Sequence, residues 1–181
     1  MNAADRLGPE DWIAAALDVL AESGAAAVRV EPLAKRLGVT RGSFYWHFKD
    51  RRALLDALLD AWRDRQTDGV IAEAEALGAP PGETLRELLK LCYQDDGRLE
   101  KAFRAWAASD PAAAQLIAKV DARRVAYLAR LLRGMGFEKP IADARARIAY
   151  RAWLGGYALA AAPAGKTVAR DIDELYALLT A

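Results

Sequence analysis

The 181-residue chain has one cysteine, one histidine and a formal net charge of only +1. A single cysteine excludes internal disulfides and suits a reducing cytosol, and a single histidine excludes a histidine-rich metal site. The small net charge excludes a polycation that condenses nucleic acid. The least polar stretch, residues 155–163, is far shorter than the ~20 residues that cross a bilayer, and the N-terminus lacks a secretion signal. We therefore expect a cytoplasmic protein with no membrane partner and no metal.

Catalytic motifs are also missing from the sequence. It contains no nucleophile elbow and no phosphate-binding loop, and its carboxylate pairs fall in a predicted turn (Asp95 and Asp96) or on a polar helix face (Glu73 and Glu75). We therefore expect neither an enzyme nor catalytic residues, and no cofactor. Apolar residues recur at spacings of three and four between Gly- and Pro-rich breaks, and we find no convincing strand. This pattern predicts an all-α fold of about nine helices.

Two short helical patterns meet at Gly38. Leu33 and Leu37 share one helical face, and Gly38 stands where the first helix must end, at a position that tolerates a left-handed backbone. Thr40 follows as a candidate N-cap whose hydroxyl accepts hydrogen bonds from free N–H groups of the next helix. In that helix Phe44 and Phe48 are four residues apart and are expected to point inward. This arrangement predicts a helix-turn-helix, whose second helix enters the major groove of DNA.

The other side of the second helix carries the groups that DNA binding needs. Hydroxyl, guanidinium, aromatic and imidazole side chains can contact phosphates and base edges, and Gly42 leaves room for a sugar-phosphate chain near the helix start. Basic residues also concentrate in this segment, although the whole chain is nearly neutral. From this surface we predict DNA contacts by Thr40, Arg41, Gly42, Ser43, Tyr45, Trp46, His47 and Lys49.

The same window resembles the DNA-binding signature of the tetracycline-repressor (TetR) family of bacterial transcriptional regulators. The resemblance rests on Leu33-Ala34-x3-Gly38-Val39-Thr40-x-Gly42-Ser43-Phe44-Tyr45-x-His47-Phe48-x-Asp50-Arg51-x2-Leu54, roughly the first third of the chain. The family usually has threonine at the position of Arg29 and lysine at that of Arg51. Because both arginines keep the capacity to bind phosphate, the resemblance adds Arg29 and Arg51 to the predicted DNA contacts.

The resemblance implies a three-helix DNA-binding domain at residues 1–52 and a helical ligand-binding and dimerisation domain at residues 53–181. A helix from Asp50 to about Leu77 is expected to connect them. The implied function is that of a dimeric repressor, which a small organic effector of unknown identity releases from a palindromic operator in double-stranded DNA.

Two further sets of residues are predicted in the second domain. Aromatic side chains are candidates for lining an effector cavity, although core packing explains most of them: Tyr93, Phe103, Trp106, Tyr127, Tyr150, Trp153 and Tyr157. Apolar and small residues of the last two predicted helices are candidates for a homodimer interface, unless the paired glycines only admit an aromatic ring within one subunit: Ile148, Ala152, Gly155, Gly156, Leu159, Ile172, Leu175 and Leu179.

Two other functions remain open at this stage. The chain can be a helical ligand-binding protein or an enzyme in which the helix-turn-helix is a structural relic, and loss of sequence-selective DNA binding is its signature. It can also be a nucleoid-type binder, for which the small net charge is unfavourable.

Overall fold

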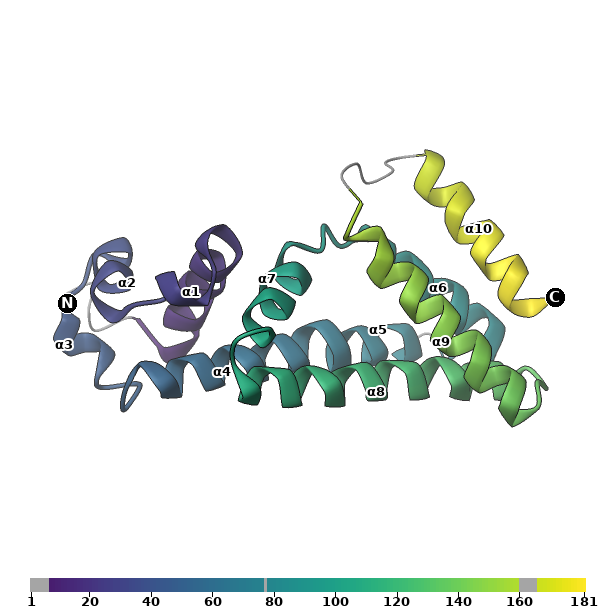
Figure 1. Ribbon diagram of the computed structural model, residues 1–181, viewed down its shortest axis with the longest axis horizontal. Coiled ribbons are helices and arrows are strands. Elements are labelled where there is room, and N and C mark those ends of the chain that lie inside the picture. Colours follow the sequence, from purple (N-terminus) through teal and green to yellow (C-terminus); the bar gives the residue numbers. More distant parts are fainter. Residues whose placement is uncertain (1–6, 77, 160–165) are drawn as a thin grey trace. The chain divides into compact units, whose positions relative to one another are not determined.

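A computed structural model describes residues 7–76, 78–159 and 166–181 of the chain. Figure 1 labels the α-helices. Together with one 3₁₀ turn and one π-helical segment, they follow one another along the chain in this order: α1 (Pro9–Ser23), a 3₁₀ turn (Ala25–Ala27), α2 (Val30–Leu37), α3 (Arg41–Phe44), α4 (Arg51–Arg63), a π-helical segment (Asp64–Gly69), α5 (Val70–Ala76), α6 (Pro81–Gln94), α7 (Arg98–Ala107), α8 (Pro111–Gly134), α9 (Lys139–Gly156) and α10 (Lys166–Thr180).

The described residues form no strand, so the all-α prediction is confirmed. The α4 helix, the π-helical segment and α5 follow one another without a break, and counted as one they leave nine helices in the described part of the chain. The predicted connecting helix begins at Asp50 as expected, since the Asp50 carboxylate accepts a hydrogen bond from the Ala53 N–H at 2.9 Å. Its predicted end, Leu77, lies outside the described residues. No described helix is both long and apolar enough to cross a bilayer.

The chain folds into two compact units. The first contains residues 1–64 and 98–117, and the second contains residues 65–97 and 118–181. Segments that are distant in the sequence therefore complete each unit: α7 belongs with α1–α4, and α5 and α6 belong with α9 and α10. The predicted boundary at residue 52 separates a DNA-binding domain from a ligand-binding domain, whereas the two units are defined by compact packing. The functional boundary therefore stays a prediction.

Aromatic packing holds the first unit together. Trp12 of α1 and Phe44 of α3 are fully buried and meet edge to face with ring centroids 5.2 Å apart. Phe48 stacks on Phe44 at 5.5 Å, and Trp62 stacks on Phe103 at 4.8 Å. Burying a side chain of this size contributes on the order of 2–3 kcal/mol. Phe44 therefore fixes the motif around Gly38 to α1, and both phenylalanines point inward as the sequence predicted.

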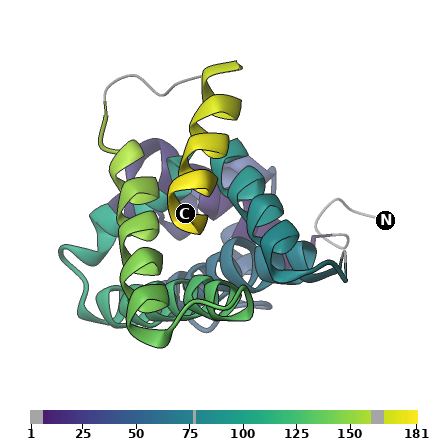
Figure 2. The ribbon, with the colours of Figure 1, turned by 90° about the vertical axis from the view of Figure 1, so that its right-hand side faces the viewer.

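Small residues allow close packing in the second unit. Ala142 and Ala146 of α9 are fully buried in a core that also contains Leu85 of α6 and Leu132 of α8. The last helix, α10, packs against both α6 and α9 (Figure 2). The α6–α10 contact includes an ion pair between Arg86 and Asp173. Together with α5, which contributes the buried Ala74, these four helices surround one core, and this arrangement positions the pocket described below.

Candidate DNA-binding surface and ligand pocket

The turn between α2 and α3 has the geometry that the sequence predicted at its glycine. Gly38 adopts a left-handed backbone with φ +69°, and the following Val39 N–H donates to the Ala34 carbonyl at 3.0 Å. Thr40 occupies the N-cap of α3, but its hydroxyl makes no capping hydrogen bond. The position of Thr40 is therefore as predicted, whereas its predicted capping interaction is wrong.

The second helix of the motif is shorter than the phenylalanine spacing indicated. The α-helical part of α3 is Arg41–Phe44, and hydrogen-bonded turns carry the chain on to Phe48. Phe44 and Phe48 are both buried, so the inward side of the motif is confirmed. The compact turns keep residues 45–47 beside α3 on the outer surface.

The outward side of the motif is open to solvent. Trp46 is 87% exposed and Tyr45 is 49% exposed, which is unusual for large aromatic residues. Gly42 is exposed, and a Cβ at that position would have only the Thr40 hydroxyl nearby, at 3.6 Å. The Arg41 guanidinium donates to the Tyr45 hydroxyl at 3.2 Å. Ser43 and His47 are half-buried at the sides of this surface.

Ion pairs remove two of the basic residues of this region from the set that can bind phosphate. Arg36 binds the Glu22 carboxylate through two hydrogen bonds of 2.9 and 3.0 Å, and Arg52 pairs with Asp56 and Asp110. Three other cations are exposed and form no ion pair with any described residue: Arg29, Lys35 and Lys49. With Arg41, they form the positively charged part of the surface.

Arg51 has a different role from the predicted phosphate contact. Its guanidinium donates to the backbone carbonyls of Val28 and Ala25 at 2.5 and 2.6 Å. These bonds connect the start of α4 to the 3₁₀ turn before α2. The geometry thus favours a structural role for Arg51, and its predicted contact with DNA is untested.

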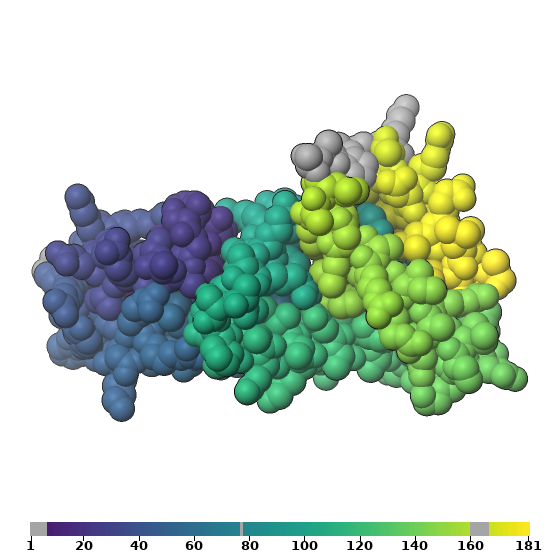
Figure 3. Space-filling view, viewed as in Figure 1, coloured from purple at the N-terminus to yellow at the C-terminus, as the bar shows by residue number. Residues whose placement is uncertain are grey.

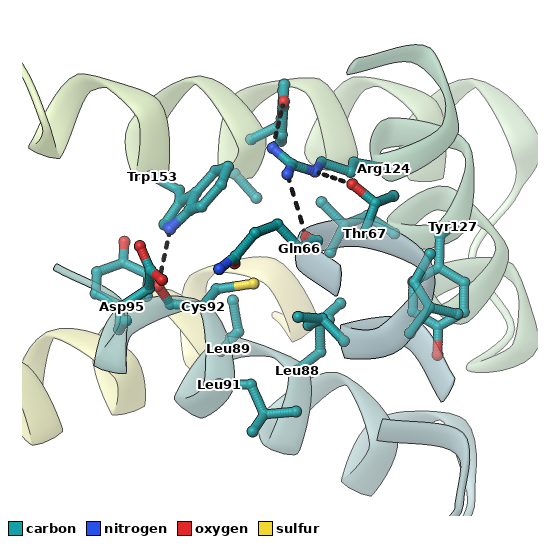
Figure 4. A pocket seen from close by; sticks show the side chains of 16 residues that line it. Gln66, Thr67, Leu88, Leu89, Leu91, Cys92, Asp95, Arg124, Tyr127 and Trp153 are labelled. Atoms are coloured by element: carbon teal, nitrogen blue, oxygen red, sulfur yellow. Dashed lines mark hydrogen bonds between the residues drawn. The ribbon is translucent and has the colours of Figure 1, made fainter. Parts of the chain in front are cut away.

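A pocket lies inside the second unit, between the π-helical segment, α5, α6, α8 and α9 (Figure 4). Four of the seven predicted aromatic residues line it: Tyr93, Tyr127, Tyr150 and Trp153. Phe103 and Trp106 do not, because both are buried in the first unit. Tyr157 does not line the pocket either; its ring packs on Trp153 at 5.2 Å and against Gly97, where it leaves no room for a Cβ.

The polar end of the pocket is organised around Arg124 of α8. Its Nε donates to the Thr67 hydroxyl at 2.9 Å, and its Nη2 donates to the Gln66 backbone carbonyl at 3.1 Å. The Tyr150 hydroxyl accepts from Arg124 at 3.4 Å and donates to the Asp121 carboxylate at 2.6 Å. Burial raises the pKa of Tyr150, so this hydroxyl keeps its proton.

Sequence reasoning missed Gln66, Thr67 and Arg124 because it searched the second domain for aromatic residues. The one available signal was a pair of polar residues, Gln66 and Thr67, in the middle of a predicted helix. Carbonyl groups in a π-helical turn do not follow the usual i→i−4 pairing, and such turns are frequent at functional sites. The Gln66 carbonyl that accepts from Arg124 lies within this π-helical segment.

The predicted dimer residues are distributed over both sides of the last helices. Ile148 and Leu159 are 62% and 66% exposed, and Ala152 and Gly155 are exposed beside them. Gly156 and Leu175 are half-buried. Ile172 and Leu179 lie in the core of the second unit, so they stabilise the chain itself. Outer surfaces of α9 and α10 are visible in Figure 3.

The comparisons with known proteins agree with the motif and with the fold. Residues 13–58 match the family model described as bacterial regulatory proteins, tetR family. Over 56 residues the chain is 50% identical to the tetracycline repressor protein class A from transposon 1721 of Escherichia coli, which covers 31% of this chain and 26% of that repressor. A transcriptional regulator from Rhodococcus sp. Rha1 has the same fold, with a TM-score of 0.74 and 25% identity over 96% of each chain.

Residues 13–58 of the chain are thus similar to the segment that characterises the tetR family of bacterial regulatory proteins. The segment matched in the class A repressor spans about a quarter of that protein, and the AcrR regulator of Shigella flexneri is 34% identical over 77 residues, or 41% of this chain and 34% of AcrR. Each of these two matches therefore covers less than half of this chain. The similarity that extends over nearly the whole chain is one of fold.

Proposed function

We propose that this protein is a sequence-specific transcriptional regulator of the tetR family that binds double-stranded DNA through α3 and the turns after it. The observation that carries the proposal is the two-sided motif: Phe44 and Phe48 fix it to the core, while Tyr45 and Trp46 are exposed beside Arg41. Major-groove recognition needs this combination of a rigid scaffold and outward donors. Phosphate binding is supported by Arg29, Lys35 and Lys49, which have no acidic partner among the described residues.

We further propose that the protein acts as a homodimer on a palindromic operator. One short helix offers few base contacts, and two copies related by a two-fold axis double them. A self-complementary contact is supported by exposed residues of α9, Ile148 with the small Ala152 and Gly155, and by the exposed Leu159 in the turn after that helix. We do not include Ile172 and Leu179 in this surface, since they are buried within the chain.

Regulation is proposed to come from a small organic molecule in the pocket of the second unit, which releases a repressor from its operator. Gln66 and Thr67 line that pocket and lie in the helical stretch that begins at Asp50. A ligand with different affinities for two arrangements of this stretch would shift the population of DNA-binding molecules.

Quantitative footprinting at several salt concentrations tests the proposed DNA contacts. Lys49→Ala should weaken binding to all sequences similarly, because a lysine–phosphate contact does not depend on the base. Arg41→Ala should instead change the preference among bases. Equal loss of preference in both variants would contradict the assignment of α3 as the element that recognises sequence.

A further inference from the structure

The pocket of the second unit has a mostly apolar wall and a polar end. Leucines of α6, among them Leu88 and Leu89, form one side, and aromatic residues of α8 and α9 form the other. The cavity has a volume of about 70 Å³ and opens to solvent, so a larger occupant would extend into the open part. These properties fit a small organic molecule.

The Gln66 side chain is a polar group of the pocket that is available to a ligand. Figure 4 shows it extending between Trp153 on one side and Leu89 on the other, with its amide near Cys92. This amide forms no hydrogen bond with any described residue, although the backbone carbonyl of Gln66 is held by Arg124. A primary amide offers two donors and two acceptor sites, so it can bind a partner that presents an acceptor and a donor side by side.

The charges at the polar end of the pocket compensate one another. The Tyr150 hydroxyl lies between the Arg124 guanidinium, from which it accepts at 3.4 Å, and the Asp121 carboxylate, to which it donates at 2.6 Å. At this end of the pocket an anionic ligand would meet a cation whose charge a nearby carboxylate offsets, and a cationic ligand would be repelled by Arg124. The other charged lining residue, Asp95, accepts a hydrogen bond from the Gly97 N–H at 2.7 Å. The electrostatic attraction in this pocket therefore does not offset the free-energy cost of desolvating a charged ligand.

Trp153 presents a large aromatic surface in a fixed orientation. Its indole N–H donates to the Cys92 carbonyl at 3.0 Å, and the Arg124 guanidinium lies over its ring at 5.3 Å. Because that N–H is already bonded, Trp153 offers a ligand contact area rather than a hydrogen bond. A flat ring system gains most from such a neighbour.

We propose that the pocket binds an uncharged, planar aromatic compound whose amide or lactam edge pairs with the side chain of Gln66. The inference rests on the proposed function, in which this pocket is the effector site, and it adds the chemical class of the effector. Gln66 belongs to the π-helical segment, so ligand recognition takes place on the helical stretch that continues from α4.

The test compares three probes that share one ring system: 2-naphthamide, 2-naphthoate and 2-naphthylmethylamine. Isothermal titration on the full chain at neutral pH should rank the amide about tenfold above the acid and the amine. Gln66→Leu should remove this preference, since an unpaired polar edge in a buried site costs about tenfold in affinity. Gln94→Leu is the matched control, because Gln94 is an exposed glutamine of α6 that does not line the pocket. It should leave the ranking unchanged.

A second variant keeps the test independent of any folding defect in Gln66→Leu. Gln66→Glu has the same shape and should reverse the ranking in favour of the amine, because it places a carboxylate where the ligand edge lies. Preferential binding of 2-naphthoate to the wild type, or an amide preference that survives in Gln66→Leu, would overturn the proposal. Absence of binding of 2-naphthamide would overturn it as well.

Failure of the proposed function would look different. DNA binding is measured separately on the ligand-free chain, and loss of all sequence-selective binding would contradict the regulator while leaving the ranking of the probes intact. Selective DNA binding together with a preference for the acid would contradict only the ligand class.

Discussion

Arg51 and Lys49 lie two residues apart in the sequence, but the structure indicates a structural role for Arg51 and leaves Lys49 available for phosphate binding. Arg51 donates two hydrogen bonds to the backbone carbonyls of Val28 and Ala25, whereas Lys49 is exposed and has no ion pair among the described residues. Hydrogen bonds from a charged donor contribute more than neutral ones, but one of these two is exposed to water. We estimate a loss of about 2 kcal/mol of stability for Arg51→Ala, which lowers the melting temperature by about 4–8 °C.

Lys49→Ala should have the opposite profile. A surface lysine without partners changes stability by less than about 0.5 kcal/mol. Losing one phosphate contact in each subunit of a dimer should reduce the slope of log affinity against log salt by about 1.8. Raising the salt from 50 to 200 mM would thus weaken DNA binding by the variant roughly twelvefold less than binding by the wild type.

The two quantities are measured by thermal unfolding and by fluorescence anisotropy on operator DNA at several salt concentrations. Arg51→Ala should lower the melting temperature and leave the salt slope unchanged, and Arg51→Lys should recover part of the stability. A reduced salt slope with an unchanged melting temperature in Arg51→Ala would refute the structural role and restore the phosphate contact that the family resemblance implied.

Three further predictions follow from the geometry. Gly38→Ala should lower stability by about 1–2 kcal/mol in thermal unfolding, because φ is +69° although there is space for the methyl group; an unchanged melting temperature would contradict the turn geometry. The N–H of Ala113 and the Arg52 guanidinium hold the pKa of Asp110 below its usual value, so its contribution to stability is present above about pH 4 and is lost as the pH falls further. Asp110→Asn should therefore reduce the acid dependence of unfolding, and an identical acid profile would count against this. Ile148→Asp should convert the dimer to monomers in sedimentation velocity, whereas Lys90→Asp, on the exposed side of α6, should not. A dimer that persists in Ile148→Asp would exclude this face of α9 as the dimer interface.

The DNA-binding motif could be predicted closely from the sequence because local rules decide most of it. A glycine with a left-handed backbone, an aspartate N-cap and two phenylalanines at helical spacing each act over a few residues. Gly38, Asp50, Phe44 and Phe48 therefore behave as expected. The direction of the Arg51 side chain was not predictable, because its partners are carbonyl groups more than twenty residues earlier in the chain.

The pocket was predicted less well, for a different physical reason. Helical periodicity cannot distinguish an aromatic residue that lines a cavity from one in a packed core, so Phe103 was grouped with Trp153 although it is buried against Trp62. The π-helical segment has no comparable sequence rule. The pairing of its Gln66 carbonyl with Arg124 depends on a contact between segments 58 residues apart.

The most direct test is a selection of bound DNA from a random pool, using the wild-type 181-residue chain at moderate salt. We expect a palindrome whose half-sites are about one helical turn apart, and the bound protein should protect a footprint of matching length. Recovery of no common sequence, or of a single unrepeated site, would contradict a dimeric regulator that recognises DNA through α3.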